Sequence, residues 1–370
     1  MKRVFIITVF AVSVIVSFAQ PAFGQTDPGP GQEIPLIREW EKAAFGDSCL
    51  RLSPLFGMMY GHAEEIVYPP NSAYSGTEFY SQLLWDIKPV FYYGLMLDYS
   101  PAGPEKQRGF FLSLLLKFGI SGISGNMEDR DWVSVENDAL THYSIHDNFT
   151  REMFLFDMTA GFTFPFRRNM FLRTYIFVSY MSFHFSGMDG HGRYARAKDP
   201  FELIPTKFFP IDDHPTLADF SQQVISYTQK WLTVAPGISL GCFFLNRFFA
   251  ELSFIASPLI FCVDLDEHKK REFEIRYWDG SQYRDDTRFS SGTQFRDYLQ
   301  GGLFFEPKAS LSFVLNKYVA LSLEFSWRYI GGTKGNTFQR NYGLGDYFQA
   351  GKAGAGLSIF DAGLLCKVRM

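Results

Sequence analysis

Cysteine is scarce in this 370-residue chain, and basic residues do not dominate its charge. Lys and Arg number 35 against 39 Asp and Glu, which excludes a nucleic-acid-binding protein because such a protein needs a basic face. After residue 24 the chain lacks an apolar run of 18 residues, so no membrane-spanning helix is predicted there. The cysteines are too few and too scattered to predict a disulfide framework or a metal cluster: Cys49, Cys242, Cys262 and Cys366.

Residues 1–24 have the pattern of a secretory signal peptide. Two basic residues precede an apolar stretch over residues 4–18, and small residues lead to a predicted cleavage before Gln25. Cleavage there leaves a net charge of about −6. Residues 25–48 are proline-containing and are predicted to form an N-terminal periplasmic segment without chemistry of its own. The folded domain is therefore expected over residues 49–370.

Aromatic residues are abundant where long apolar runs are not. They make up 18% of the chain, with 41 Phe and 19 Tyr, yet the mean hydropathy is close to zero. Residues 112–120, 154–164 and 319–329 alternate, with one face apolar and the other small or polar. A soluble sandwich would not keep an apolar outer face over so many positions. The pattern therefore predicts an all-β transmembrane barrel with lipid outside and water inside.

Short and long polar connections separate the alternating segments. Four short and five long connections predict an antiparallel barrel of ten strands with both termini in the periplasm. Several strands exceed the roughly 9 to 11 residues that cross a bilayer, so the barrel is expected to project above the outer membrane. The predicted strands are 50–68, 77–99, 107–124, 144–164, 170–186, 222–243, 248–268, 296–315, 318–330 and 348–370.

This topology brings distant polar residues to one extracellular rim. Asp264, Asp266 and His268 end the seventh strand at alternate positions, so they share one face. Odd-numbered strands end at that rim and even-numbered strands begin there. The other candidates near the rim follow from the first, third and fourth strands: Glu65, Asp129, Asp131, Ser144 and His146.

Carboxylates crowded around an imidazole suit hydrolysis without a covalent nucleophile. A histidine held by a carboxylate accepts a proton from water near neutral pH. Close carboxylates do not both ionise readily, so one keeps a proton for the leaving amine. Spacing alone leaves two alternatives open: a site for a hard cation, including metal-assisted hydrolysis, and a solvated acidic rim without chemistry.

Two acidic motifs in this order resemble those of the omptins, ten-stranded outer-membrane aspartyl endoproteases. Residues 125–132, Gly-Asn-Met-Glu-Asp-Arg-Asp-Trp, are similar to the family's first motif, and Ser144-Ile145-His146 follows at close to the family's spacing. Residues 264–268, Asp-Leu-Asp-Glu-His, are similar to the second motif. Weaker likenesses extend the resemblance over the whole barrel.

The resemblance implies an endopeptidase that uses water activated by two couples. Asp266 and His268 would face Asp129 and Asp131 across the mouth, with His268 as the base. Glu65 and Asp264 would form an acidic pocket for Arg or Lys before the cut bond, in keeping with charge complementarity. Ser144 and His146 would be supporting hydrogen-bond partners. Leu84 and His142 depart from the family's pattern, so a different preference after the cut bond is expected.

The resemblance also concerns lipid on the outer wall. Omptins require lipopolysaccharide, and Tyr180, His184 and Lys230 stand near the positions of the family's lipid-binding cluster. No metal or other cofactor is predicted. Expected partners are polypeptides with basic residues and outer-membrane lipid, and a monomeric barrel is expected. The alternative function is a non-enzymatic barrel, an adhesin or narrow pore that uses loops 187–221 and 269–296.

Overall fold

The chain is an all-β structure built around one continuous sheet. Among the residues described, no helix has the length and hydrophobicity needed to cross a membrane. The predicted signal peptide and periplasmic segment lie outside the described residues. The computed structural model describes residues 49–69, 78–100, 109–167, 170–199, 201–202, 205–245, 247–316, 318–341 and 345–369.

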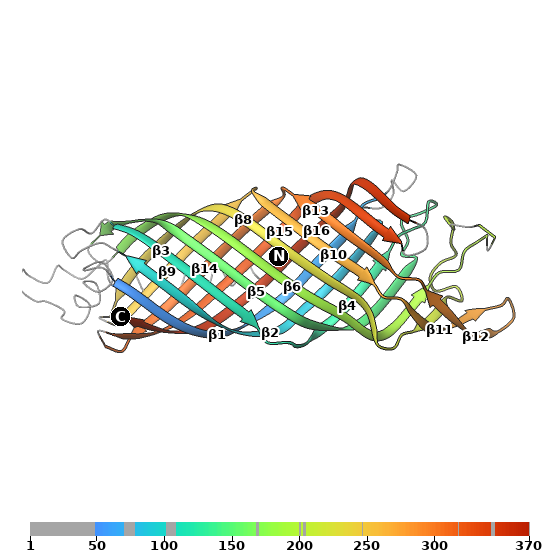
Figure 1. Ribbon diagram of the computed structural model, residues 1–370, viewed down its shortest axis with the longest axis horizontal. Coiled ribbons are helices and arrows are strands. Elements are labelled where there is room, and N and C mark those ends of the chain that lie inside the picture. Colours follow the sequence, from blue (N-terminus) through green and yellow to red (C-terminus); the bar gives the residue numbers. More distant parts are fainter. Residues whose placement is uncertain are drawn as a thin grey trace, which may run out of the picture.

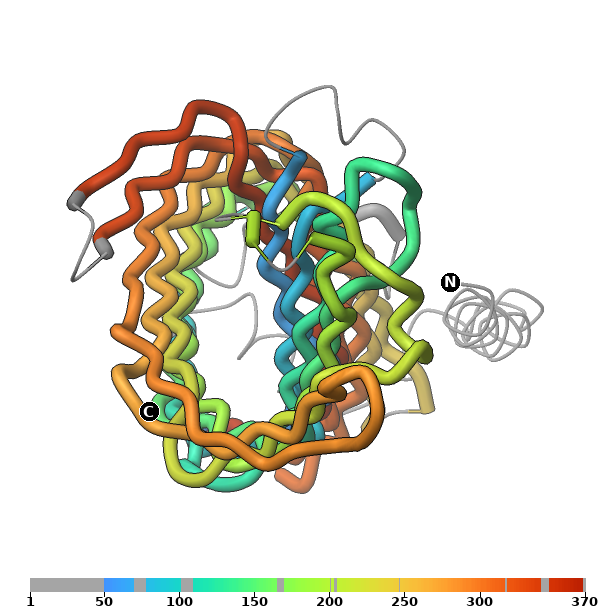
Figure 2. The backbone as a smooth tube through the Cα atoms, turned by 90° about the vertical axis from the view of Figure 1, so that its right-hand side faces the viewer, coloured from blue at the N-terminus to red at the C-terminus, as the bar shows by residue number. Residues whose placement is uncertain are grey.

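Antiparallel strands close into a ten-position ring, as predicted, and the first strand pairs with the last (Figure 1). Figure 2 looks along the ring and shows its oval section. At three of the ten positions in the ring, a break divides the strand into two shorter strands that follow one another in the sequence. The ring consists of β1 (Cys49–Val67), β2 (Ser81–Ser100), β3 (Gly109–Gly119) with β4 (Gly122–Asp131), β5 (His142–Arg167), β6 (Met170–Tyr194), β8 (Gln223–Phe244), β9 (Phe248–Ser257) with β10 (Ile260–His268), β13 (Thr293–Gln300) with β14 (Leu303–Val314), β15 (Val319–Asn341) and β16 (Gly345–Arg369).

Local sequence explains two of the interruptions. Pro258 falls between β9 and β10, where a residue without an N–H group cannot continue the ladder of hydrogen bonds. Gly301 and Gly302 separate β13 from β14 with φ values of 74° and 88°, in the left-handed region that glycine adopts without strain. The strands change direction at these breaks. The end of the barrel that carries β11 and β12, here called the mouth, is therefore built from β4, β10 and β13 instead of straight continuations of β3, β9 and β14.

The predicted long loops were too long. β5 and β6 run 26 and 25 residues, and β15 continues to Asn341 instead of ending at 330. Within the predicted loops 187–221 and 269–296, the chain also forms β7 (Thr216–Asp219), β11 (Arg271–Trp278) and β12 (Tyr283–Ser290). Above the lipid, both faces of a strand contact water or polar groups. The apolar–polar alternation that identifies a strand in the sequence is therefore lost there.

An apolar belt surrounds the part of the barrel away from β11 and β12. Its side chains include Phe56, Tyr60, Phe91, Phe162 and Leu364, all exposed to 42% or more. Further along the same strands, the outward side chains become polar, as in the exposed His62, Lys88, Arg151 and Lys230. A belt of this kind is the surface that a bilayer covers, so the residues beyond it stand above the lipid.

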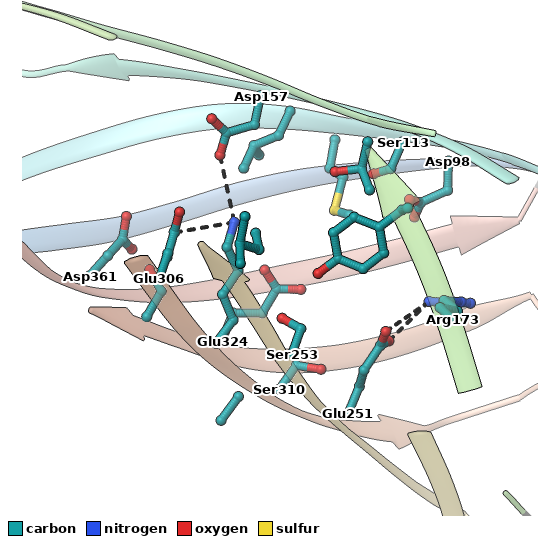
Figure 3. Close-up of a pocket in the computed structure, with 18 of the residues that line it drawn as sticks. Asp98, Ser113, Asp157, Arg173, Glu251, Ser253, Glu306, Ser310, Glu324 and Asp361 are labelled. Carbon is teal, nitrogen blue, oxygen red and sulfur yellow. Dashed lines mark hydrogen bonds and ion pairs between the residues drawn. The ribbon is translucent and has the colours of Figure 1, made fainter. Parts of the chain in front are cut away.

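Paired charges fill the barrel inside this belt. Arg328 donates to Asp157 at 2.9 Å and to Glu306 at 3.1 Å, and all three side chains are at most 6% exposed. Arg173 forms a second pair with Glu251 at 3.0 Å. Acids from several strands point into a cavity of about 210 Å³ between these pairs (Figure 3). The carboxylates of Asp157, Glu306 and Glu251 therefore each have a cationic partner.

Replacing Arg328 with alanine is expected to lower the free energy of unfolding by about 3 kcal/mol, because Asp157 and Glu306 then keep only the contacts of 3.7 and 3.2 Å to Lys308. The measurement is reversible unfolding of the lipid-refolded barrel in urea. The matched control is Arg340→Ala, whose ion pair with Asp346 is largely exposed (62% and 69%) and is worth at most about 1 kcal/mol. Equal losses for the two variants would show that the buried network does not stabilise the barrel.

Candidate active site

One face of β10 carries the histidine–carboxylate couple. Asp264 and Asp266 are 1% and 2% exposed, whereas Val263, which precedes Asp264, is 39% exposed on the outer wall. Asp264, Asp266 and His268 therefore share the inner face of the barrel. His268 Nε2 lies 2.8 Å from Asp266 Oδ2, and the histidine side chain is 35% exposed. The pair combines a fixed imidazole with access to water in the mouth.

Asp129 and Asp131 lie on β4, on the opposite wall. Three ring positions, those of β5, β6 and β8, separate β4 from β10. Burial and the neighbouring Asp131 raise the pKa of Asp129, and the charge of His268 lowers it. The pKa of Asp131 is likewise raised by burial and lowered by His142 and His268. The two couples are thus close enough across the lumen to affect one another's protonation.

The protonation of His268 reflects opposing influences. Burial lowers the pKa of the imidazole, but Asp266 raises it through charge and a hydrogen bond, and Asp129 adds to the increase. The resulting pKa is about 8. Near that pH the ring exchanges between its protonated form and the neutral form that accepts a proton.

Glu65 and Asp264 lie deeper in the same mouth. Glu65 is 3% exposed, and its pKa is raised by burial and by the surrounding carboxylates, Asp266 and Asp264 above all. Burial and neighbouring acids also raise the pKa of Asp264. Glu65 Oε2 and Asp264 Oδ1 are buried without a hydrogen-bond partner in the described structure. Such a pocket favours a ligand that brings positive charge and several donors.

A chain of hydrogen bonds along β8 fixes Asp264. Trp231 Nε1 donates to Gln229 at 3.0 Å, and Gln229 donates to the Tyr227 hydroxyl at 2.8 Å. Tyr227 in turn donates to Asp264 Oδ2 at 3.1 Å. Gln229 also donates to the Glu64 carbonyl at 2.8 Å, which ties β8 to β1 across the interior.

Buried aromatic rings stack beside the carboxylates of the mouth. Trp85 stacks on Tyr227 with ring centroids 5.3 Å apart and on Phe185 at 5.7 Å. All three side chains have no exposed surface. Tyr227 links this stack to Asp264 through its hydroxyl group.

Ser144 and His146 form a buried pair on β5. His146 Nδ1 faces the Asp189 carbonyl, which only accepts, so Nδ1 carries the hydrogen. Nε2 is then free to accept from the Ser144 hydroxyl, 2.9 Å away. Burial lowers the pKa of His146 to about 4, which keeps the ring neutral. Ser144 stands opposite Asp129 in the β4–β5 register, so the pair borders the second couple.

The three candidate lipid-binding residues lie together on the outer wall. Tyr180 and His184 are on β6, beside Leu232 and Thr228 of β8, and Lys230 pairs with Ser182. His184 Nε2 lies 3.0 Å from the Ser226 hydroxyl. Lys230 is exposed at the upper edge of the apolar belt, where a lipid headgroup would lie.

Sequence reasoning missed three side chains of the mouth. Asp297 on β13 is buried opposite Asp264. Tyr194 hydrogen-bonds to Ser144, and its pKa is raised by burial and by Asp129 and Asp131. Arg271 on β11 donates to the Val224 carbonyl at 2.7 Å. The clue for Asp297 was its place at the start of the eighth strand, which begins at the rim where the seventh ends.

Metal ligation was also an alternative at the rim. Across the described ranges, no group of three or more His, Cys, Asp or Glu side chains has the arrangement of a metal site. The mouth offers one imidazole and several carboxylates, a ligand set better suited to hard cations than to zinc.

The ring and its carboxylate-lined mouth define a ten-stranded barrel with a hydrolase-like site. The model of the Omptin family matches residues 48–364, so this chain belongs to the omptin family. Curated proteins gave no match.

Solved structures agree on the fold. The outer membrane protease OmpT from Escherichia coli aligns with a TM-score of 0.70 and 17% identity, covering 87% of this chain and 97% of that chain. At this identity the likeness shows the fold alone. The toluene transporter TodX of P. putida aligns with a TM-score of 0.26 and 9% identity over 89% and 92% of the two chains. The transport unit of the Escherichia coli autotransporter AIDA-I gives 0.27 and 8% over 97% of each chain, and neither carries an argument.

Gln229→Leu is expected to destabilise the barrel by about 1 to 3 kcal/mol for each group left unsatisfied, since the Trp231 N–H and the Glu64 carbonyl lose their partner in a dry interior. Urea unfolding of the refolded barrel measures the loss. Gln300→Leu, at an exposed position on β13, is the matched control and should change stability little. A Gln229 variant as stable as that control would mean that the β8 chain of hydrogen bonds does not hold the mouth together.

Proposed function

We propose that this chain is an outer-membrane surface endopeptidase that cleaves polypeptides after Arg or Lys. Its family and its fold support an outer-membrane protease. The observation that carries the finer proposal is the His268–Asp266 couple, 2.8 Å between partners, facing Asp129 and Asp131 across the mouth. The mouth lies beyond the apolar belt, so in this proposal it opens to the outside of the cell.

The proposed reaction uses water rather than a side-chain nucleophile. Neutral His268 takes a proton from a water that lies between the two couples, and the water oxygen attacks the peptide carbonyl carbon. Asp266 stabilises the imidazolium that forms. Burial keeps the Asp129–Asp131 pair partly protonated, so one carboxyl can hold the water or donate to the developing oxyanion. The proton on His268 then passes to the leaving amine, and the C–N bond breaks.

The proposed specificity comes from the acids below the couple. Glu65 and Asp264 are buried, carry unpartnered oxygens and have no salt bridge in the described structure. A guanidinium or ammonium group would supply both the charge and the donors. Ser144 and His146 would hold β5 beside Asp129 without taking part in bond cleavage. Tyr180, His184 and Lys230 would contact a lipid headgroup, with lipopolysaccharide as the proposed lipid.

Asp266→Ala and His268→Ala are each expected to reduce cleavage of an arginine-containing peptide by about 10²- to 10⁴-fold, the contribution of a positioned general base. Product formation by the refolded barrel, followed by mass spectrometry, also locates the cut bond. Asp286→Ala on β12 and His62→Ala on the outer face of β1, both at exposed positions, are the matched controls. Full activity in the Asp266 or His268 variant would refute the mechanism, and loss of activity on adding a chelator would favour metal-assisted hydrolysis instead.

The pH dependence of kcat/KM should follow His268. Only the neutral ring accepts a proton, so activity is expected to rise with pH through about 8 and then level off. Asp266→Asn removes the main cause of the raised pKa, so the acid limb of the residual activity should move down by about 1 to 3 pH units. NMR titration of the imidazole checks the same shift independently of turnover. An acid limb that does not move would show that another group is the base.

A further inference from the structure

Asp297 is a fourth buried acid in the mouth, next to the three already assigned on β1 and β10. It lies on β13 directly opposite Asp264 of β10, and on its other side it pairs with Thr337 of β15. Its side chain is 3% exposed. Asp297 therefore extends the Glu65–Asp264 pocket along the wall away from β8.

The buried acids of this barrel fall into two groups. Inside the apolar belt, Asp157 and Glu306 are ion-paired with Arg328. In the mouth, by contrast, the described structure contains no ion pair to Glu65, Asp264 or Asp297, and each keeps one buried oxygen without a partner. Desolvating an acid without a partner is costly. These three acids of the mouth therefore lack a cationic partner, whereas the same fold supplies Arg328 to the acids inside the apolar belt.

Asp264 and Asp297 face each other in the β10–β13 register, and the charge of Asp297 raises the pKa of Asp264, which favours one proton on the pair. The charged or titratable groups around this pair are Asp266 and the Cys262 thiol on β10, Glu65 on β1 and Tyr227 on β8, and β15 contributes the Thr337 hydroxyl. All the ionisable neighbours are acidic, so the pair retains its proton until a cation arrives. Burial foremost raises the pKa of Asp297 to about 7.

We propose that Asp297 is a specificity-determining residue, the third carboxylate of the pocket, which together with Asp264 binds the forked guanidinium of an arginine before the cut bond. This inference rests on the proposed function. Two carboxylates on neighbouring strands offer acceptors side by side, a geometry that suits the five donors of a planar guanidinium better than the compact ammonium of lysine. Binding of the guanidinium releases the shared proton to solvent.

The test compares three peptides that differ only in the residue before the cut bond. That residue is arginine, lysine or citrulline, the neutral isostere of arginine. Asp297→Asn is expected to lower kcat/KM for the arginine peptide by about 10- to 100-fold, the value of one charge-assisted hydrogen bond. It should change cleavage of the citrulline peptide little and reduce the preference for arginine over lysine. Glu272→Gln, an exposed charge-matched change on β11, should leave all three rates as in the unmodified protein.

Peptide affinity in the His268→Ala background separates this inference from the proposed function. In that background, Asp297→Asn should weaken binding of the arginine peptide and leave binding of the citrulline peptide unchanged. This expectation holds whether or not the unmodified protein cleaves either peptide. An unchanged arginine-to-citrulline ratio would overturn the role of Asp297. An equal loss for both peptides would also overturn it, because Asp297 would then act on the fold or on Asp266. If the unmodified protein does not cleave the peptides but still binds the arginine peptide selectively, the proposed endopeptidase activity is refuted. The proposed role of Asp297 in binding arginine is then retained.

Discussion

Closure of the sheet by the pairing of β1 with β16 is the constraint on which the mouth depends. An open sheet would leave Glu65 at one edge, far from the carboxylates of β10. In the closed ring, inward side chains from every strand share one narrow volume, and acids from β1, β4, β10 and β13 face each other there. Strand alternation decides which residues enter that volume, because a shift of one residue would turn Asp264, Asp266 and His268 outward together.

The same closed ring treats buried charge in two ways. Inside the apolar belt, acids and bases pair and hold opposite walls together, as Arg328 does between Asp157 and Glu306. In the mouth, Glu65, Asp264 and Asp297 have no ion pair in the described structure, and His268 pairs with Asp266. The first arrangement stabilises an otherwise polar lumen. The second leaves a site whose protonation responds to whatever cationic group enters it.

Much of this architecture follows from the sequence, and its limits have a physical origin. Alternation predicted the ten strands wherever one face meets lipid, and it failed for β7, β11 and β12, where both faces are polar. Strand parity was enough to group Asp264, Asp266 and His268. The sequence did not predict the place of Asp297 in the mouth, because the β11–β12 hairpin separates β10 from β13. A connection of that length does not define the register between the two strands. The chain of hydrogen bonds through Gln229 on β8 was not predicted either, because it depends on which walls of the ring face each other.

The most direct test of the convergence of these acids is a crystal structure of the His268→Ala barrel with an uncut arginine peptide. We expect the guanidinium to lie among Glu65, Asp264 and Asp297. The scissile carbonyl should lie between β4 and β10, with a water within hydrogen-bond reach of Asp129 or Asp131. A peptide bound instead on the outer surface of β11 and β12, with its arginine in solvent, would contradict it.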